Sequence, residues 1–306
     1  MPAAGNCVFY RETKMSLFFQ TLISGLNLGS IYALIALGYT MVYGIAKMLN
    51  FAHGDVIMIG AYSVIVTVSS LGLPPVVAIL IGIAFCALLG VSIEFLAYKP
   101  LRKASSLAVL ITAIGVSYFL QNIAQLIFGT QQLAFPKIIN LSPIKIGSVQ
   151  IDGITLVTLC VTAVIMVLLT LFINFTKIGK AMRAVSEDKE AAELMGISTN
   201  RTISITFAIG SALAMIASLF YGATYTYIKP TTGSMPGIKA FTAAVFGGIG
   251  SIPGAMLGGI MLGIIEQYAK AYISTTMSDA IVFGVLILVL LVKPTGLLGK
   301  KISEKV

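Results

Sequence analysis

Charge is scarce in this sequence, and its scarcity excludes a soluble protein. Charged residues make up 10% of the 306 residues, 58% are hydrophobic, and the mean hydropathy is +0.99. A soluble domain has about a quarter of its residues charged. The net charge of +9 is then better explained by basic loops that stay in the cytoplasm than by nucleic acid, so we expect no nucleic-acid partner.

Cysteine and histidine are too few and too dispersed for a metal centre or a disulfide framework. Cys7, Cys86 and Cys160 show no ligand spacing, and the last two lie in apolar runs, where a thiol is a small packing residue. His53 is the single histidine. We therefore expect no metal and no other cofactor. Without a paired nucleophile and base, the chain is predicted not to be an enzyme.

A nucleotide-binding loop is also missing. The pattern G-x-x-x-x-G-K-[ST] cradles phosphates, and its nearest counterpart is PTGLLGKK at residues 294–301. Here Pro294 replaces the first glycine and Lys301 replaces the serine or threonine. The chain is therefore not expected to bind ATP by this route.

Long uncharged runs dominate what is present. Most of them exceed the roughly 20 apolar residues that a helix needs to cross a bilayer, and they are continuous rather than alternating. The sequence predicts an all-α, polytopic helical membrane protein with about eight or nine transmembrane segments. The expected spans are residues 16–45, 55–71, 75–98, 105–128, 153–176, 202–228, a broken region 238–273 that turns at 247–254, and 277–293.

Basic clusters suggest how the spans are oriented. Lys and Arg gather at residues 99–103, 177–201 and 293–305, and all three clusters can be cytoplasmic only if 238–273 crosses twice. Counting the crossings in the same way, from the first cluster back to the start of the chain, places the N-terminus outside. We divide the chain into a polar leader (1–14), a single transmembrane domain (15–300) and a cytoplasmic tail (301–306). Met15 is an alternative start to Met1.

Two further patterns concern packing. The loop 129–152 contains the alternating stretch IKIGSVQI and predicts a small hairpin on the outer face. Glycines recur at four-residue spacing, which favours close helix packing over direct contact with a solute. They are Gly250, Gly254 and Gly258, and then Gly259 and Gly263.

The stretch LNFAHGD, residues 49–55, places polar groups between two apolar runs. A stand-alone secondary transporter could use His53 and Asp55 as a proton relay. The residue types favour a turn instead, in which Gly54 permits the bend while Asn50 and Asp55 cap helix ends.

Uncharged amides lie within the predicted spans. Amides in hydrocarbon need partners, so they either join helices or line a wet path. Together with the 49–55 stretch they give the candidate translocation path: Asn27, Asn50, His53, Gln121, Asn122 and Gln125. Glu94 and Glu266 lie near span ends, where we expect them to reach the interface. A zwitterionic or neutral solute fits such spans better than a strongly charged one.

The segment 181–197, AMRAVSEDKEAAELMGI, is rich in charge and predicts a short helix that is too polar to span. Ser186 is the expected N-cap, Glu187 and Asp188 suit the positive end of the helix dipole, and Gly196 suits its end.

This predicted helix has one apolar face. Ala191, Leu194 and Met195 recur at helical spacing, whereas Lys189 and Glu193 are placed to pair on the other side. Four acids in eleven residues suit an anionic leaflet poorly, so a protein partner is the better inference.

Three stretches resemble the LivH-type permeases of bacterial branched-chain amino acid ABC transporters. They are GSIYALIALGYTMVYGIAKMLNFAHGD (29–55), GKAMRAVSEDKEAAELMGI (179–197) and GIKAFTAAVFGGIGSIPGAMLGGIMLGIIE (237–266). They occur in the family's order, and the resemblance covers essentially everything from residue 15 to 299.

The resemblance implies a multi-pass permease subunit of the bacterial inner membrane. Its implied partners are a homologous LivM-type permease, two cytoplasmic ATP-binding subunits and an extracytoplasmic solute-binding protein. The segment 181–197 then corresponds to the helix that couples the ATPases to the membrane, formed by Glu187, Asp188, Ala191, Ala192, Leu194, Met195 and Gly196. Related permeases for urea or short-chain amides leave a second substrate class open.

Overall fold

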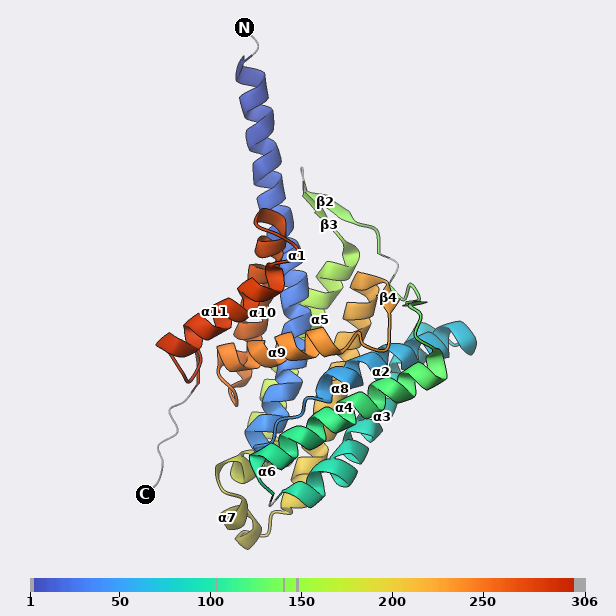
Figure 1. The fold of residues 1–306 in the computed structure, drawn as a ribbon, viewed down its shortest axis with the longest axis vertical. Helices are drawn as coiled ribbons and strands as arrows, with labels where there is room; N and C mark the ends of the chain where they lie inside the picture. Colours follow the sequence, from blue (N-terminus) through green and yellow to red (C-terminus); the bar gives the residue numbers. More distant parts are fainter. Residues whose placement is uncertain (1–2, 103, 140, 147–148, 300–306) are drawn as a thin grey trace.

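One long helix, α1 (Ala3–Ala46), runs through the centre of the molecule (Figure 1). The computed structural model describes residues 3–102, 104–139, 141–146 and 149–299. Helix α1 runs without a break from residue 3 into the apolar run. The boundary between a polar leader (1–14) and the transmembrane domain therefore stays a prediction. The predicted tail 301–306 lies outside the described residues.

The other elements follow the predicted order closely. They are α2 (His53–Ile65), which continues as a π-helical turn (Val66–Ser70), α3 (Pro75–Ile93) with the turns Glu94–Tyr98 and Lys99–Leu101, α4 (Ser106–Phe128), α5 (Gly153–Phe175), α6 (Lys177–Glu187), α7 (Lys189–Leu194), α8 (Thr199–Tyr225), α9 (Ser234–Gly247), α10 (Ile252–Tyr272) and α11 (Ser278–Val292). The short strands are β1 (Leu133–Ala134), β2 (Ile144–Ile146), β3 (Val149–Ile151) and β4 (Tyr227–Ile228). The all-α, polytopic fold class is confirmed.

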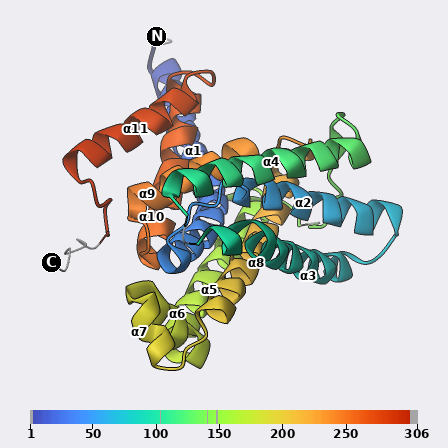
Figure 2. The same ribbon diagram turned by 60° about the horizontal axis from the view of Figure 1, so that its bottom comes forward.

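The two ends of the molecule differ. At one end β2 and β3 form the predicted antiparallel hairpin, and Gln20 of α1 donates to the carbonyl of Gln150 at 2.8 Å. We call this the hairpin end. At the other end α6 and α7 project from the body (Figure 2), and Lys189 reaches the last residue of α1. We call this the α7 end.

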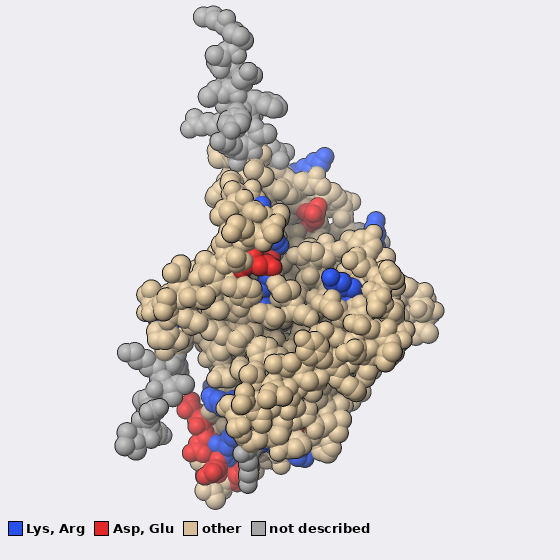
Figure 3. All heavy atoms as spheres, viewed as in Figure 1, with Lys and Arg blue, Asp and Glu red and all other residues tan. Residues whose placement is uncertain are grey.

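Burial divides the spans into inner and outer helices. Most of α1 is buried, whereas less than a third of α3, α4 and α5 is buried, although α3 and α5 are the most apolar. This distribution suits helices whose outer faces meet lipid, and it leaves a broad uncharged surface between the two ends (Figure 3). In the described residues six helices are long and apolar enough to cross a membrane. The count of eight or nine spans therefore stays a prediction.

The predicted break at 247–254 is confirmed. Helix α9 ends at Gly247 and α10 begins at Ile252, with Ser251 as N-cap. Between them Gly248 and Gly250 have φ of +107° and +91°, a region that favours glycine. At 14 residues α9 is about 21 Å long, too short to cross a bilayer of about 30 Å alone.

Glycine allows α10 to pack closely against two helices, as predicted. A Cβ on Gly259 would meet Ala33 of α1, and a Cβ on Gly258 would meet Ala243 of α9. Gly263 and Gly254 make equivalent close approaches to α1 and α9. The prediction is wrong for Gly250, because it lies in the turn and has open space around it.

Candidate functional site

Helices α2 and α9 begin at the same place inside the molecule. A Cβ on Gly54 would lie 3.2 Å from the Cα of Gly237, and one on Gly233 would collide with the carbonyl of Gly54. The backbones therefore touch near the N-terminus of each helix. Broken helices that meet inside a membrane protein are typical of solute pathways, because their unpaired backbone groups need a polar or protein-lined space.

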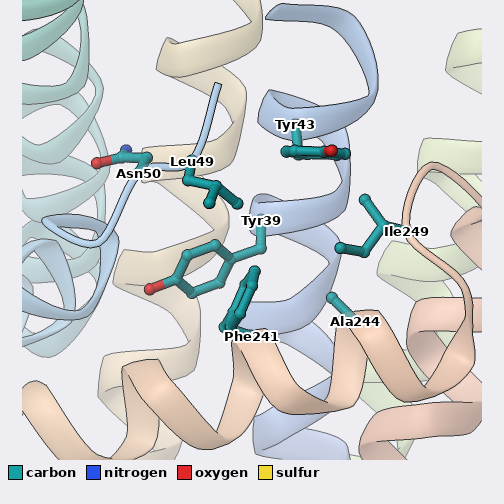
Figure 4. A pocket seen from close by; sticks show the side chains of 7 residues that line it. All are labelled: Tyr39, Tyr43, Leu49, Asn50, Phe241, Ala244 and Ile249. Carbon is teal, nitrogen blue, oxygen red and sulfur yellow. The ribbon is translucent and has the colours of Figure 1, made fainter. Parts of the chain in front are cut away.

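A cavity lies beside this junction (Figure 4). It is a small, open hollow bounded by the C-terminal half of α1, residues 49–50, α9 and the turn after α9, and its empty space together with the adjoining open solvent is about 210 Å³. The lining residues are Tyr39, Tyr43, Leu49, Asn50, Phe241, Ala244 and Ile249. None of these side chains is a carboxylate or an amine, so the cavity suits an uncharged, largely apolar group.

The segment 49–55 forms the predicted turn, but its side chains do not cap helix ends. Asn50 is buried and its Oδ1 accepts a hydrogen bond from the Tyr98 hydroxyl at 3.0 Å. Asp55 is buried in the first turn of α2 and accepts from Gln121 of α4 at 2.9 Å. The N-cap position belongs to Ala52, which makes no side-chain cap. The capping prediction is wrong because both polar groups hold neighbouring helices instead.

His53 is packed inside the protein and is not hydrogen-bonded to Asp55. Its ring contacts Tyr39 with centroids 4.7 Å apart, and a Cβ on Gly38 would lie 2.5 Å from its Nε2. Nε2 is buried and has no hydrogen-bond partner among the described residues. Asp55 is engaged by α4, so the hydrogen bonds within the described chain include none between the two proposed relay groups.

The remaining path candidates are scattered. Gln121 is buried and donates to Asp55, to Ser117 and to Ser234. Gln125 is half-buried, and Asn122 is exposed and donates to the carbonyl of its own helix at Tyr118. Asn27 is buried elsewhere, 3.4 Å from the Thr224 hydroxyl. Only Asn50 lines the cavity, so these side chains do not form one continuous polar wall.

An ion-pair network was missed. Glu266 does not reach the interface: it is buried and binds Lys239 at 2.8 Å, Lys270 at 2.6 Å and the Tyr32 hydroxyl at 2.9 Å. Lys239 also binds Asp279 at 2.6 Å, which joins α9, α10 and α11. The signal in the sequence was a lysine at the start of an otherwise uncharged span.

Glu94 is also buried, contrary to its expected place at the interface. It pairs with Arg102 and accepts a hydrogen bond from Ser204 of α8 at 2.6 Å. Arg102 in turn donates to Asn200. The ion pair therefore ties the end of α3 to α8, at the α7 end of the molecule.

The charged segment forms two helices rather than one. Ser186 is not the N-cap, because it donates to the carbonyl of Arg183 inside α6, and Glu187 is the last residue of α6. Asp188 is the N-cap of α7 and accepts from the N–H groups of Glu190 and Ala191. The predicted stop at Gly196 agrees with its φ of +81°.

The faces of α7 are distinct. Ala192 is buried against the body, whereas Ala191 is exposed and Leu194 and Met195 are 89% and 82% exposed. Acidic side chains gather at this end of the molecule (Figure 3). The apolar face predicted from spacing therefore exists, and it points away from the chain.

These features define a class: a multi-pass helical membrane protein with broken helices at its centre and an exposed apolar face on a short helix at one end. Residues 21–290 match the family described as the permease component of branched-chain amino acid transport systems. The chain belongs to this family, which confirms the resemblance, and it is a multi-pass protein of the bacterial inner membrane.

Named relatives agree with this membership. The chain is 47% identical to the high-affinity branched-chain amino acid transport system permease protein LivH of Escherichia coli (strain K12), over 94% of this chain and 98% of that one. It is 45% identical to the corresponding protein BraD of Pseudomonas aeruginosa, with the same coverage. Among solved structures, PsaBC from Streptococcus pneumoniae in complex with Fab has a TM-score of 0.47 at 16% identity over 91% of this chain and 92% of that chain, which is too distant to support a conclusion.

Proposed function

We propose that this chain is the permease subunit of a binding-protein-dependent importer of branched-chain, aliphatic amino acids, and that α7 is its contact with the ATPase subunits. The observation that supports the contact is the exposure of Leu194, the last residue of the six-residue helix α7, and of Met195, its C-cap. Exposed apolar groups with a polar surround are typical of protein interfaces. The sequence has no phosphate-binding loop of its own, so in this proposal ATP is hydrolysed by a partner.

The partners follow from the same proposal. Two ATP-binding subunits occupy the α7 end, which becomes the cytoplasmic side, and a solute-binding protein delivers at the hairpin end. The exposed apolar surfaces of α3, α4 and α5 leave room for a homologous LivM-type permease as well as lipid. The chain itself catalyses no reaction in this scheme.

The cavity between α1, the segment 47–52 and α9 is the proposed place for the aliphatic side chain of the solute. Tyr39, Phe241 and Ile249 supply apolar contact, and the Asn50 amide, whose oxygen accepts from Tyr98, points away from them (Figure 4). The junction of the α2 and α9 N-termini next to it offers partial positive charge, which suits a carboxylate. Gln121 and His53 act from behind this junction by positioning α2, and Asn27, Asn122 and Gln125 stay weaker candidates for the path.

The test distinguishes a loss of ATPase docking at α7 from a failure of the permease to insert into the membrane. Changing both Leu194→Glu and Met195→Glu in the assembled transporter should remove the apolar contact, so the ATPases should no longer co-purify with the membrane subunits and ATP-driven leucine uptake into proteoliposomes should stop. Ile178→Glu, on the exposed side of α6, is the control at the same end of the molecule. Normal membrane yield with unchanged ATPase binding in the double variant would refute the α7 contact.

The rival function is tested with the chain alone. A proton-coupled secondary transporter would take up solute into proteoliposomes under a proton gradient without any partner. The packing of His53 against Tyr39 and the absence of a hydrogen bond at its Nε2 among the described residues do not support it, and we expect no uptake. The substrate class is tested by competition, where isoleucine and valine should displace leucine and urea or acetamide should not.

A further inference from the structure

Lys189 of α7 binds the end of the central helix. Its Nζ donates a hydrogen bond of 2.9 Å to the carbonyl oxygen of Ala46, the last residue of α1. The last carbonyls of a helix have no donor within the helix, and a lysine there is also attracted to the negative end of the helix dipole. A residue far away in the sequence thus supplies the C-terminal cap of α1.

The surroundings make this contact easy to shift. Lys189 is partly buried, and burial together with the nearby charges of Arg102 and Lys47 lowers the pKa of its amine. The salt bridges between described residues include none to Lys189, so the predicted pair with Glu193 is wrong. The cation is therefore held mainly by a backbone carbonyl, in the company of two other cations.

The residues after Ala46 lead directly into the cavity. Lys47 has a left-handed φ of 57°, which turns the chain out of α1. Leu49 and Asn50 then line the cavity. Tyr98 holds them from the other side, since its hydroxyl donates to Asn50 Oδ1 at 3.0 Å and lies 3.3 Å from the carbonyl oxygen of Leu49. This short stretch of cavity wall is thus fixed at one end by α7 and at the other by Tyr98.

We propose that Lys189 is the positioning residue through which movement of α7 changes the wall of the cavity at residues 49–50. When α7 shifts, the amine leaves the Ala46 carbonyl, the end of α1 loses its cap, and the segment 47–50 is free to move around the left-handed turn at Lys47. This inference rests on the proposed docking of ATPases at α7, and it adds the route from that helix to the solute.

The experiment uses the complete transporter in proteoliposomes. Leu49→Cys in a background with Cys7→Ser, Cys86→Ala and Cys160→Ser reports on the cavity wall by its rate of labelling with a membrane-impermeant maleimide, with and without ATP. Lys189→Met removes the donor at similar length, and Lys189→Arg retains a donor. Lys180→Met, an exposed lysine on α6, is the matched control.

In the reference protein ATP should change the labelling rate of the Leu49→Cys thiol. With Lys189→Met we expect the ATP-dependent change to vanish and uptake per ATP hydrolysed to fall about tenfold, within the range usual for coupling between sites. ATPase association should be unchanged, Lys189→Arg should restore most of the response, and Lys180→Met should behave as the reference.

Three results would overturn the inference. The first is a Lys189→Met variant that keeps both its uptake and its ATP-dependent change in labelling rate, and the second is a reference protein whose labelling rate does not change with ATP. The third is loss of ATPase association in Lys189→Met. The last result would assign Lys189 to docking or folding. Failure of the docking proposal is seen separately, because the Leu194→Glu, Met195→Glu variant would then keep its ATPases.

Discussion

Gln121 of α4 donates a hydrogen bond of 2.9 Å to Asp55 of α2, and the same amide nitrogen lies 3.2 Å from the Ser234 hydroxyl of α9. A peripheral helix is thereby connected to both helices that begin at the central junction. Asp55 and Gln121 are buried and Ser234 is partly buried, and an unpaired polar atom costs far more inside the protein than in water. Gln121 therefore determines how α4 sits against the junction.

Changing Gln121→Leu should destabilise the permease, because it leaves the Asp55 carboxyl buried without this donor. We expect a loss of about 1–3 kcal/mol in the free energy of unfolding, measured as a lower thermal midpoint in detergent. Gln125→Leu, one turn along and half-buried, is the control and should change the midpoint little. A lower leucine affinity with unchanged stability in Gln121→Leu would place this side chain on the solute path instead.

The buried ion pair between Lys239 and Glu266 gives a second prediction. Lys239→Met should cost about 1–3 kcal/mol, since Glu266 loses one buried partner but keeps Lys270 and the Tyr32 hydroxyl. The double variant Lys239→Met, Glu266→Gln should cost less than the sum of the two single variants, because the second change removes a carboxylate that has already lost one partner. Lys270→Met is a milder comparison because its side chain is 29% exposed.

Chemical unfolding in detergent of the reference protein, Lys239→Met, Glu266→Gln and the double variant completes this double-mutant cycle. If the double variant is as unstable as the sum of the two single variants, Lys239 and Glu266 do not stabilise each other.

The spans could be predicted from sequence because the bilayer fixes both their length and their polarity. The run expected at 153–176 is α5 (Gly153–Phe175), and the run expected at 105–128 is α4, capped by Ser105. The break between α9 and α10 was also predictable, since glycine-rich turns and the parity of basic clusters agree there. In each case one local property of the chain decides the outcome.

The site was predicted less well, because its contacts are made between distant residues. Nothing local distinguishes Asp55 as a cap from Asp55 as an acceptor for α4, which is 66 residues away. Ser186 and Asp188 are two residues apart, and both residue types are good N-caps. N-cap preference alone therefore could not show that α6 ends and α7 begins at Asp188. The sequence shows that Glu266 is a charged residue near the end of a span, but it does not show that Lys239 lies beside it, because the two come together only when the chain folds.

The left-handed turn at Lys47 gives a third prediction. A non-glycine residue there pays about 1–2 kcal/mol of steric strain, and Lys47 also repels Lys189. Lys47→Asn keeps a residue that tolerates this conformation and removes the charge, so it should raise the thermal midpoint slightly. Lys47→Val should lower it, because a β-branched residue resists a positive φ. Equal midpoints for Asn and Val would show that α1 ends differently.

The last prediction concerns two glycines whose replacement by alanine should have opposite effects. Gly29 lies where α1 meets α10, and a Cβ there would be 2.7 Å from both the Cα and the carbonyl oxygen of Ile260. Backbone atoms cannot move aside cheaply, so Gly29→Ala should cost about 1–3 kcal/mol. Gly115 of α4 has open space around it, so Gly115→Ala should gain up to about 1 kcal/mol from helix propensity alone.

Thermal unfolding of the chain purified alone gives the sign of each effect. Both variants are single methyl additions within helices, so a gain in stability shared by both would mean that helix propensity, rather than the approach of α10, decides the effect at Gly29. Opposite shifts would establish that α10 packs on α1 through bare backbone. In the assembled transporter the gain at Gly115 should persist if this face meets lipid, and it should turn into a loss if a second permease packs there.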